Sequence, residues 1–399
     1  MINPLSLNPA RRLYSLLICA GLLHAPSLAA SFTPLGYLPG GGRVSYAQGI
    51  SADGKFVVGA SGSTAPGFEA FRWSAATGMQ GLGDLPTGNF YSEARAISND
   101  GNTVVGLGTA TDSSTLTDGF RWTAAGGMQP IGYLGIPNSS FQYSSPVAMS
   151  ADGNTVTGGS GSAQGSEAFR WNVHDGMTGL GDLPGSYFES YASSISADGS
   201  VIVGYGTVGL GLTEPFRWRA ATGIVGLGFT TDTPHPGDAL GMSPDGNIIV
   251  GTEWGIPWRW TAATGYTTLP TLEPNGASYP MDVSADGSVI IGNSEFGSSA
   301  GRVPPFIWTA SGGTQYLSDY LATHFGISLN GWTLQDANAI SDDGRFVVGD
   351  AVNNANGDLV AYLIDLKVPE PSAAALFALM SSAIVLCRSH ALHRRFRVG

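Results

Sequence analysis

Ser51-Ala52-Asp53-Gly54 is followed at once by an apolar β-branched run that ends in glycine, Val57-Val58-Gly59. The tetrapeptide pattern Ser-x-Asp-Gly recurs along the chain, and its seven aspartates are Asp53, Asp100, Asp152, Asp198, Asp245, Asp286 and Asp343. Successive aspartates lie 47, 52, 46, 47, 41 and 57 residues apart. Self-similarity at such a period indicates one supersecondary unit per copy, stacked on its neighbours.

Each copy contains the pattern of four short strands. An apolar segment such as Ala96-Ile97 precedes every Asp-Gly turn, so two strands flank the turn as a β-hairpin. A third strand carries Phe-Arg-Trp, as at Ala70–Trp73, and its seventh copy is the degenerate Ala361–Ile364. A fourth element carries Gly-Leu-Gly, as at Gly81–Gly83, and is joined to the third by a Thr-Gly or Gly-Gly turn.

The seventh unit lacks its own fourth strand, and the start of the chain supplies one. Pro34–Pro39 matches the fourth-strand pattern of Gly81–Pro86. Seven four-stranded units, with the N-terminal strand completing the last one, predict an all-β fold: a closed seven-bladed β-propeller over residues 30–367. Closure removes the sheet edges that would otherwise pair with other chains.

The repeat resembles the HAF family of probable extracellular repeats. The resemblance runs from Phe32 to Leu366 and rests on the Ser-x-Asp-Gly turns, the Phe-Arg-Trp strands and the Gly-Leu-Gly-Asp-Leu-Pro segments at 81–86 and 179–184. It implies an exported location and no particular reaction. The sixth and seventh units depart from the family pattern, because Ile307 and Leu363 replace the arginine, which leaves the register of the last blade open.

Tyr316–Trp332 is an insertion between the sixth and seventh units. We expect an ordinary long loop there. The alternative is a short helix over Ser318–Phe325, with Ser318 as its N-cap, covering one end of the propeller channel.

The repeated aspartates suit two roles. An Asp in such a turn accepts hydrogen bonds from its own backbone, while the following Gly supplies a positive φ. Carboxylate oxygens also suit Ca²⁺, but one carboxylate per blade, spread around a ring, makes a poor cage. We therefore expect turn capping, and neither a metal site nor a cofactor site.

The Phe-Arg-Trp strands place Phe71 and Trp73 on one face and Arg72 on the other. We expect the aromatic rings to pack between blades and Arg72 to hydrogen-bond nearby carbonyls or a turn carboxylate. Because the same residues recur in most blades, they do not form the single convergent cluster that catalysis requires. His174, His235 and His324 lie in different units without zinc-ligand spacing, so the sequence specifies no catalytic residues.

Residues 1–29 have the features of a secretory signal peptide. Arg11 and Arg12 precede an apolar run at Leu13–Leu23, and Ser27-Leu28-Ala29 places small residues before a cleavage site after Ala29. The arginine pair also allows twin-arginine export.

Residues 368–399 form a second targeting segment. Pro369-Glu370-Pro371 precedes the uncharged apolar stretch Ser372–Cys387 and an arginine-rich end that contains Arg394 and Arg395. Taken alone, this pattern predicts a transmembrane helix whose basic end stays in the cytoplasm. The three parts together resemble the PEP-CTERM sorting signal of Gram-negative bacteria, which implies processing by an exosortase and a host that makes an extracellular polysaccharide or biofilm matrix. The alternative is a plain membrane anchor.

Charge and cysteine content narrow the function further. The net charge is −12, and removing residues 1–29 and the last 28 residues takes away six arginines and no acidic residue, which leaves 12 basic and 30 acidic residues, or −18. Such a surface disfavours nucleic acid and tolerates cations and neutral glycans. Both cysteines, Cys19 and Cys387, lie in the end segments, so the mature protein would have neither disulfides nor thiol chemistry.

We therefore expect a non-enzymatic extracellular or cell-surface propeller that takes part in interactions within exopolysaccharide or biofilm, or with other surface proteins. One alternative is a carbohydrate-binding propeller that uses exposed aromatic rings after the fourth strands, at Phe90, Tyr91, Tyr187 and Phe188. A third reading is a glycan hydrolase, which requires an isolated acidic pair at one mouth of the channel.

Overall fold

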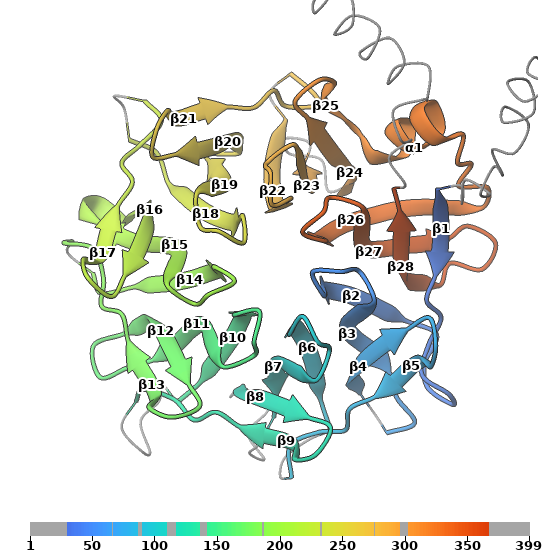
Figure 1. The fold of residues 1–399 in the computed structure, drawn as a ribbon, viewed down its shortest axis with the longest axis horizontal. Helices are drawn as coiled ribbons and strands as arrows, with labels where there is room; N and C mark the ends of the chain where they lie inside the picture. The colour runs from blue at the N-terminus through green and yellow to red at the C-terminus, as the bar shows by residue number, and fades with distance from the viewer. Residues whose placement is uncertain are drawn as a thin grey trace, which may run out of the picture.

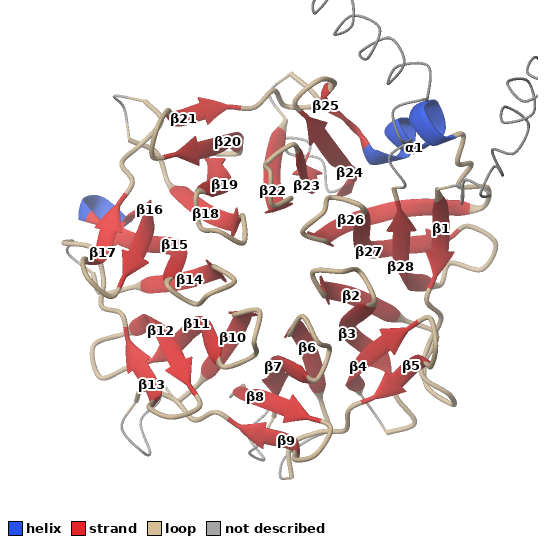
Figure 2. Ribbon diagram, viewed as in Figure 1, coloured by secondary structure: helices blue, strands red, loops and turns tan. Residues whose placement is uncertain are grey.

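The computed structural model describes residues 30–366, apart from 66, 87–89, 110–116, 136–141, 186, 232–233, 275 and 296–301. Seven four-stranded antiparallel sheets surround a central channel, as Figures 1 and 2 show. The prediction of an all-β seven-bladed propeller is confirmed. The predicted signal peptide and the predicted tail, including Pro369, Glu370 and Pro371, lie outside the described residues. Within the described part, no helix is long and apolar enough to cross a membrane.

Strands run from the channel to the rim in chain order within blades 1 to 6, and in blade 7 the N-terminal strand takes the outermost place. Blades 1 to 3 are β2 (Ser45–Ile50), β3 (Phe56–Gly62), β4 (Phe68–Ser74), β5 (Gly78–Gly81); β6 (Ser92–Ile97), β7 (Thr103–Gly108), β8 (Asp118–Thr123), β9 (Gly127–Pro130); and β10 (Ser144–Met149), β11 (Thr155–Gly161), β12 (Ser166–Asn172), β13 (Gly176–Gly179). Blades 4 and 5 are β14 (Ser190–Ile195), β15 (Val201–Val208), β16 (Leu212–Arg219), β17 (Gly223–Gly226); and β18 (Gly237–Met242), β19 (Ile248–Glu253), β20 (Ile256–Thr261), β21 (Gly265–Thr268).

The last two blades bracket a helix. Blade 6 is β22 (Ala277–Val283), β23 (Val289–Glu295), β24 (Arg302–Thr309) and β25 (Gly313–Tyr316), and α1 (Leu317–Phe325) follows it. Blade 7 is β26 (Trp332–Ile340), β27 (Phe346–Asn353), β28 (Leu359–Asp365) and β1 (Ser31–Pro34).

The N-terminal strand closes the ring as predicted. β1 pairs antiparallel with β28, with Phe32 opposite Ile364. The predicted fourth strand was placed slightly too late, because β5 ends at Gly81 and the Gly-Leu-Gly segment follows it. Leu82 N–H donates to the Ala70 carbonyl at 2.8 Å, and Gly83 adopts a φ of +81°, so the chain turns there toward the next blade.

The Asp-Gly turns close all seven inner hairpins, and the predicted turn capping is confirmed. In blade 4, the Ser196 hydroxyl donates to Asp198 Oδ1 at 2.6 Å, and Ser200 N–H donates to the same oxygen at 2.9 Å. The Ser196 hydroxyl oxygen accepts from Val201 N–H at 3.0 Å. Gly199 has a φ of +71°. This conformation costs glycine little free energy, because glycine has no Cβ. The other six turns repeat this arrangement.

The hydrophobic core is divided into clusters that lie between neighbouring blades. Phe71 of blade 1 packs with Ala47 and with Val348 of blade 7, and all three are completely buried. The third strand of every blade buries one aromatic ring in this way: Phe71, Phe120, Phe169, Phe216, Trp258, Phe306 and Tyr362. The prediction that these rings pack between blades is confirmed for the first ring of the motif, whereas Trp73 is only half-buried.

The insertion after blade 6 forms a helix, so the expected long loop is wrong. α1 begins after Tyr316 rather than after Ser318, and no side chain caps its N-terminus. Leu317 and Leu321 are one turn apart and are completely buried in the cluster between blades 6 and 7. The helix lies at the rim of the ring, beside β24, and does not cover the channel (Figure 1).

Candidate functional site

The seven inner strands line the channel, and each carries a β-bulge at the same place. In blade 1 the register shifts between Ala47 and Gly49, and the corresponding shift recurs in the other six blades. A bulge inserts one extra residue into one strand and changes the direction in which the following side chains point. We call the end of the channel with the Asp-Gly turns the turn face, and the opposite end, where the inner strands begin, the loop face.

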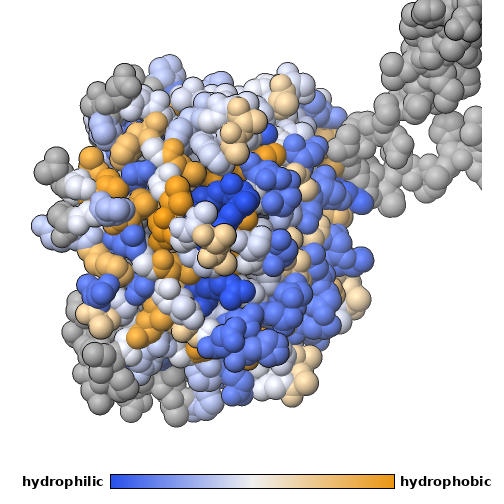
Figure 3. Space-filling model, turned by 60° about the vertical axis from the view of Figure 1, so that its left-hand side comes forward, coloured by the Kyte–Doolittle hydropathy of each residue, from blue (hydrophilic) through white to orange (hydrophobic). Residues whose placement is uncertain are grey.

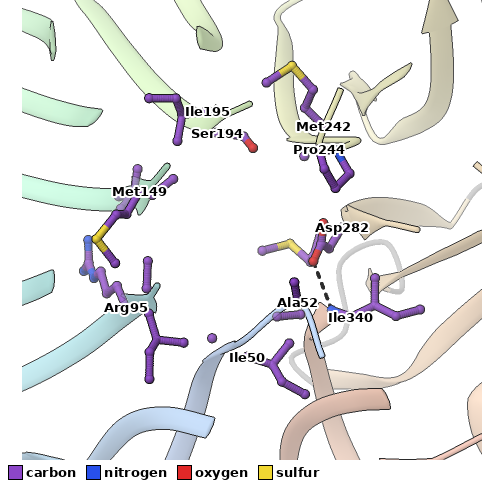
Figure 4. A pocket seen from close by; sticks show the side chains of 18 of the residues that line it. Ile50, Ala52, Arg95, Met149, Ser194, Ile195, Met242, Pro244, Asp282 and Ile340 are labelled. Carbon is purple, nitrogen blue, oxygen red and sulfur yellow. Dashed lines mark hydrogen bonds between the residues drawn. The ribbon is translucent and has the colours of Figure 1, made fainter. Parts of the chain in front are cut away.

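The turn-face end of the channel is lined by both apolar and polar side chains. A cavity of about 240 Å³ is lined there by the residue that ends each inner hairpin strand: Ile50, Ile97, Met149, Ile195, Met242, Val283 and Ile340. Figure 4 shows several of these side chains around the open centre. Backbone hydrogen bonds join neighbouring turns, as from Ala151 N–H to the Ala197 carbonyl at 2.9 Å. The Pro244 carbonyl accepts such a bond from Ala197 N–H. Proline has no backbone N–H, so Pro244 cannot donate a corresponding bond to the next turn.

Asp282 is a carboxylate at the turn-face cavity that has no counterpart in the other blades. The equivalent bulge residues are Gly49, Ala96, Ala148, Ser194, Gly241 and Ala339. Its carboxylate accepts from Val283 N–H at 2.8 Å and from Ile340 N–H of blade 7 at 3.0 Å (Figure 4). Burial, with Asp342 nearby, raises the pKa of Asp282 to about 7 although these two hydrogen bonds oppose the shift.

The loop-face mouth is polar and differs from blade to blade. Two cavities, of about 370 and 280 Å³, share Asp336 in their walls. The larger one is also lined by Tyr46, Gln48, Glu93, Asn338 and Asp350, and the smaller one by Tyr279, Met281, Asn293, Ser294, Glu295 and Gln335.

An acidic pair lies in the wall of the larger mouth cavity. Asp336 and Asp350 are direct cross-strand partners on β26 and β27, and Asp350 is only 3% exposed. Side chains in such register have Cβ atoms about 5 Å apart. Asp350 also accepts from Ala47 N–H of blade 1 at 2.8 Å, so it joins blades 7 and 1. At the corresponding register positions of the other blades, at most one residue is acidic.

A hydrogen-bond network continues around the mouth through blades 2 to 4. Glu93 accepts from the Tyr91 hydroxyl at 3.0 Å and from Arg95 Nε at 3.3 Å. Arg95 Nη1 donates to the Ser145 hydroxyl, which lies 3.1 Å from the Tyr191 hydroxyl. Burial together with the Glu93 carboxylate raises the pKa of Tyr91 to about 12. Tyr91 therefore stays neutral and donates its hydrogen bond to Glu93 at physiological pH.

The predicted turn residues are not brought together into a site. Each of the seven aspartates stays in its own turn, one per blade, and is engaged by that turn. Among the described residues, no three His, Cys, Asp or Glu side chains gather as metal ligands.

The arginines of the third strands bridge neighbouring blades. Arg121 Nε donates to the Gly153 carbonyl at 3.3 Å, and Arg217 Nη2 donates to the Gly246 carbonyl at 2.7 Å. Both carbonyls belong to the Asp-Gly turn of the next blade, so the expectation of carbonyl partners is confirmed at these two positions. The Arg72 guanidinium instead stacks 4.1 Å from the centre of the Phe56 ring. These contacts stabilise the ring of blades, and each of these arginines is engaged within the protein.

The predicted carbohydrate platforms are only partly exposed. Tyr187 is 69% exposed, whereas Phe90, Tyr91 and Phe188 are half-buried. Trp254 was not among the predicted platforms, yet at 72% it is the most exposed large hydrophobic side chain among the described residues. Two sequence signals point to it: the 41-residue spacing of its unit is the shortest of the six, and Trp254-Gly255 is all that separates β19 from β20.

Comparison with solved structures finds the same fold at low identity. A streptogramin B lyase matches with a TM-score of 0.53 and 14% identity over 85% of this chain and 98% of its own. A virginiamycin B lyase from Staphylococcus aureus, solved with quinupristin, gives 0.51 and 16% over 84% and 99%. A putative TolB from Agrobacterium tumefaciens gives only 0.38 and 15% over 81% and 91%. These identities show the fold alone.

No protein-family model and no curated protein matches the chain. The resemblances to HAF repeats and to the PEP-CTERM signal therefore stay predictions.

Proposed function

We propose that this protein is an exported, non-enzymatic propeller of the cell surface or extracellular matrix, and that the loop face of its channel binds glycan. The proposal combines the targeting segments expected at both ends of the chain with the contrast between the two faces of the ring.

The contrast between the faces carries the binding proposal. The turn face repeats one tetrapeptide seven times, so most of its positions are equivalent around the ring, with Asp282 and Asp342 as acidic exceptions. At one equivalent register position of the inner strands, the loop face has different side chains in successive blades: Tyr46, Glu93, Ser145, Tyr191, Asp238, Tyr279 and Asp336. Recognition of one ligand needs convergent, unlike groups around a cavity, and the loop face of the channel has that arrangement.

The chemistry of the mouth favours a saccharide. Phenol hydroxyls, carboxamides and carboxylates line the cavities, and they match the donors and acceptors of sugar hydroxyl groups. Tyrosine rings such as Tyr46 and Tyr279 add flat apolar surface. The excess of acidic residues disfavours nucleic acid and polyanions.

A glycan array tests binding. The wild-type propeller is expected to bind at least one neutral or amino-containing oligosaccharide, and Tyr46→Ala is expected to weaken that binding at least tenfold. Asn247→Ser is the matched control on the turn face, because Ser200 and Ser288 already occupy the equivalent position in other blades. An array without any signal above background would remove the glycan proposal.

Export and sorting have a separate test. We propose that residues 1–29 direct export, that the C-terminal segment anchors the chain in the membrane, and that an exosortase then cleaves near Pro369-Glu370-Pro371. Intact-mass spectrometry of the protein from the envelope and medium of its Gram-negative host is expected to find a species that starts near Ala30 and ends near Pro371. A species that retains Arg394 and Arg395 would indicate a plain membrane anchor instead.

The acidic pair at the mouth favours a second candidate, a glycan hydrolase. One carboxylic acid would protonate the leaving oxygen while the other carboxylate, as base or nucleophile, drives the addition of water. Wild-type protein would then release reducing ends from the oligosaccharide that it binds, and Asp336→Asn and Asp350→Asn would each abolish release without abolishing binding. Absence of release by the wild type removes this candidate and leaves the binding proposal intact.

A further inference from the structure

The hairpin between β19 and β20 of blade 5 has an unusual residue at its tip. Trp254 has a φ of +49°. In the described part of the chain, it is the only residue other than glycine with a positive φ. Positive φ costs a bulky L-residue free energy, and two-residue hairpins of this kind favour Asn-Gly. Trp254 gains no burial in return, since it is 72% exposed. Folding of the hairpin therefore does not explain the tryptophan.

Contacts on both sides lock this strained backbone in place. Trp254 N–H donates to the Pro236 carbonyl at 2.9 Å, and Ser278 N–H of blade 6 donates to the Gly255 carbonyl at 2.8 Å. A Cβ on Gly255 would lie 2.6 Å from the Cβ of Ala277, so no side chain fits there. A strained backbone persists only where surrounding contacts hold it in place. Such backbone is common at binding sites, where it fixes the position of a side chain.

Trp254 is held against a second ring and close to the channel mouth. The His235 ring centre lies 4.1 Å from the indole centre, at an interplanar angle of 42°. Pro236 follows His235 and leads into β18, where Asp238 belongs to the loop-face ring. The charge of Asp238 contributes to the raised pKa of Tyr279 in the next blade. The pair of Trp254 and His235 therefore lies on the loop-face side of blade 5, next to the start of the inner strand β18.

Exposed apolar side chains are found on the side of the ring that contains this hairpin. The large hydrophobic side chains that are exposed among the described residues all lie between positions 173 and 256, in blades 3 to 5: Val173, Tyr187, Val225, Trp254 and Ile256. Figure 3 turns this side of the ring forward and shows hydrophobic surface interrupted by hydrophilic groups. A hydrophobic surface with polar groups interspersed suits a small ligand that has both apolar and polar faces.

We propose that Trp254 and His235 form an aromatic platform on which one pyranose ring of the bound glycan stacks, extending the loop-face site outward from the mouth. This inference rests on the proposed function. A pyranose presents an apolar C–H face to the indole, while its hydroxyls can bond to the indole Nε1–H and to the imidazole nitrogens. Neither ring carries a fixed negative charge, which suits a neutral sugar on an otherwise acidic protein.

Trp254→Asn tests the platform, because asparagine is the residue that relieves the backbone strain. The variant is expected to raise the thermal midpoint of unfolding by about 2 °C and to lower the affinity for cellohexaose or N-acetylchitohexaose, whichever the wild type binds, at least tenfold by isothermal titration calorimetry. Trp254→Phe keeps a ring and is expected to retain most of the affinity. Gain of stability with loss of binding is a combination that a merely structural role would not produce.

Val225→Asn is the control, since Val225 is 49% exposed on the outer strand β17, away from the mouth. It is expected to bind like the wild type. Unchanged affinity in Trp254→Asn, with Tyr46→Ala still weakened, would overturn the platform and leave the mouth as the binding site. Failure of the wild type to bind either hexasaccharide would contradict the platform and count against the glycan proposal itself.

Discussion

At the scale of single residues, the Asp-Gly turns show most clearly how local chemistry repeats. Each turn aspartate accepts a serine hydroxyl and a backbone N–H, and these hydrogen bonds hold the pKa of Asp198 down to about 2. Each turn glycine lies against the preceding blade; a Cβ on Gly54 would collide with the Phe346 ring. One tetrapeptide therefore serves both the hairpin and the contact between blades.

Asp198→Ala is expected to lower the free energy of unfolding by about 1 kcal/mol, because three hydrogen bonds within the turn are lost. The pKa of Asp198 is lower in the folded protein than the value of about 3.9 in an unfolded chain. Its stabilising effect is therefore complete above pH 4 and is lost as the pH falls toward 2. Urea unfolding at pH 7 and at pH 3 should show a smaller difference between variant and wild type at pH 3. An equal difference at both pH values would contradict the assignment.

Asp282 should have the opposite pH dependence. Its pKa of about 7 lies above the unfolded value, so between about pH 4 and 7 the folded protein binds more protons than the unfolded chain. The free energy of unfolding should fall as the pH rises through this window and level off above it. Asp282→Ser copies Ser194 at the equivalent bulge of blade 4 and should flatten that slope. Urea unfolding measured at unit steps from pH 4 to 8 checks this; a slope unchanged by the substitution would be incompatible with it.

Sequence reasoning identified the residues that repeat and missed those that occur once. The turn aspartates and buried rings were predictable because each obeys a local rule seven times. Asp282, Asp350 and Trp254 occupy positions whose importance depends on strand register, on a bulge and on which blade lies opposite. Such information comes from the assembled ring, so no local pattern marks Asp282 or Asp350, and the short spacing of its unit is the sequence signal for Trp254.

At the scale of secondary-structure elements, the fourth strand of blade 7 comes from the other end of the chain. β1 covers the edge of β28, and Phe32 packs against Tyr362 and Trp332 with ring centres 5.6 and 5.7 Å apart. The likeness of Pro34–Pro39 to the other units made this closure predictable, although the paired residues begin at Ser31. Helix α1 was harder to predict, since its N-terminus has no side-chain cap and its stability comes from burial of Leu317 and Leu321.

Phe32→Ala is expected to destabilise the closure of the ring by about 2 kcal/mol, because half-buried ring contacts with two aromatic neighbours are lost. Thr33 is exposed on the same strand, and Thr33→Ala should change stability by less than about 0.5 kcal/mol. Chemical denaturation compares the two variants, and size-exclusion chromatography should show association of Phe32→Ala through the freed edge of β28. Equal stabilities would mean that β1 contributes little to closure.

At the scale of the whole molecule, the propeller separates stability from recognition. Turns, arginine bridges and buried rings repeat around the ring and hold the blades together. The unlike residues gather at the loop-face mouth and on the neighbouring hairpin of blade 5. The fold and its closure followed from the sequence, whereas the distinction between the two faces required the inner-strand register.

Calorimetric titration of the wild-type propeller and of matched loop-face and turn-face variants, with the best oligosaccharide from the array, tests this separation most directly. The double variant Tyr46→Ala/Glu93→Gln should lose at least 100-fold in affinity (about 2.7 kcal/mol) with little change in stability. Asn247→Ser on the turn face should bind like the wild type. Equal affinities for all three proteins, or a loss confined to the turn-face variant, would contradict glycan binding at the loop face.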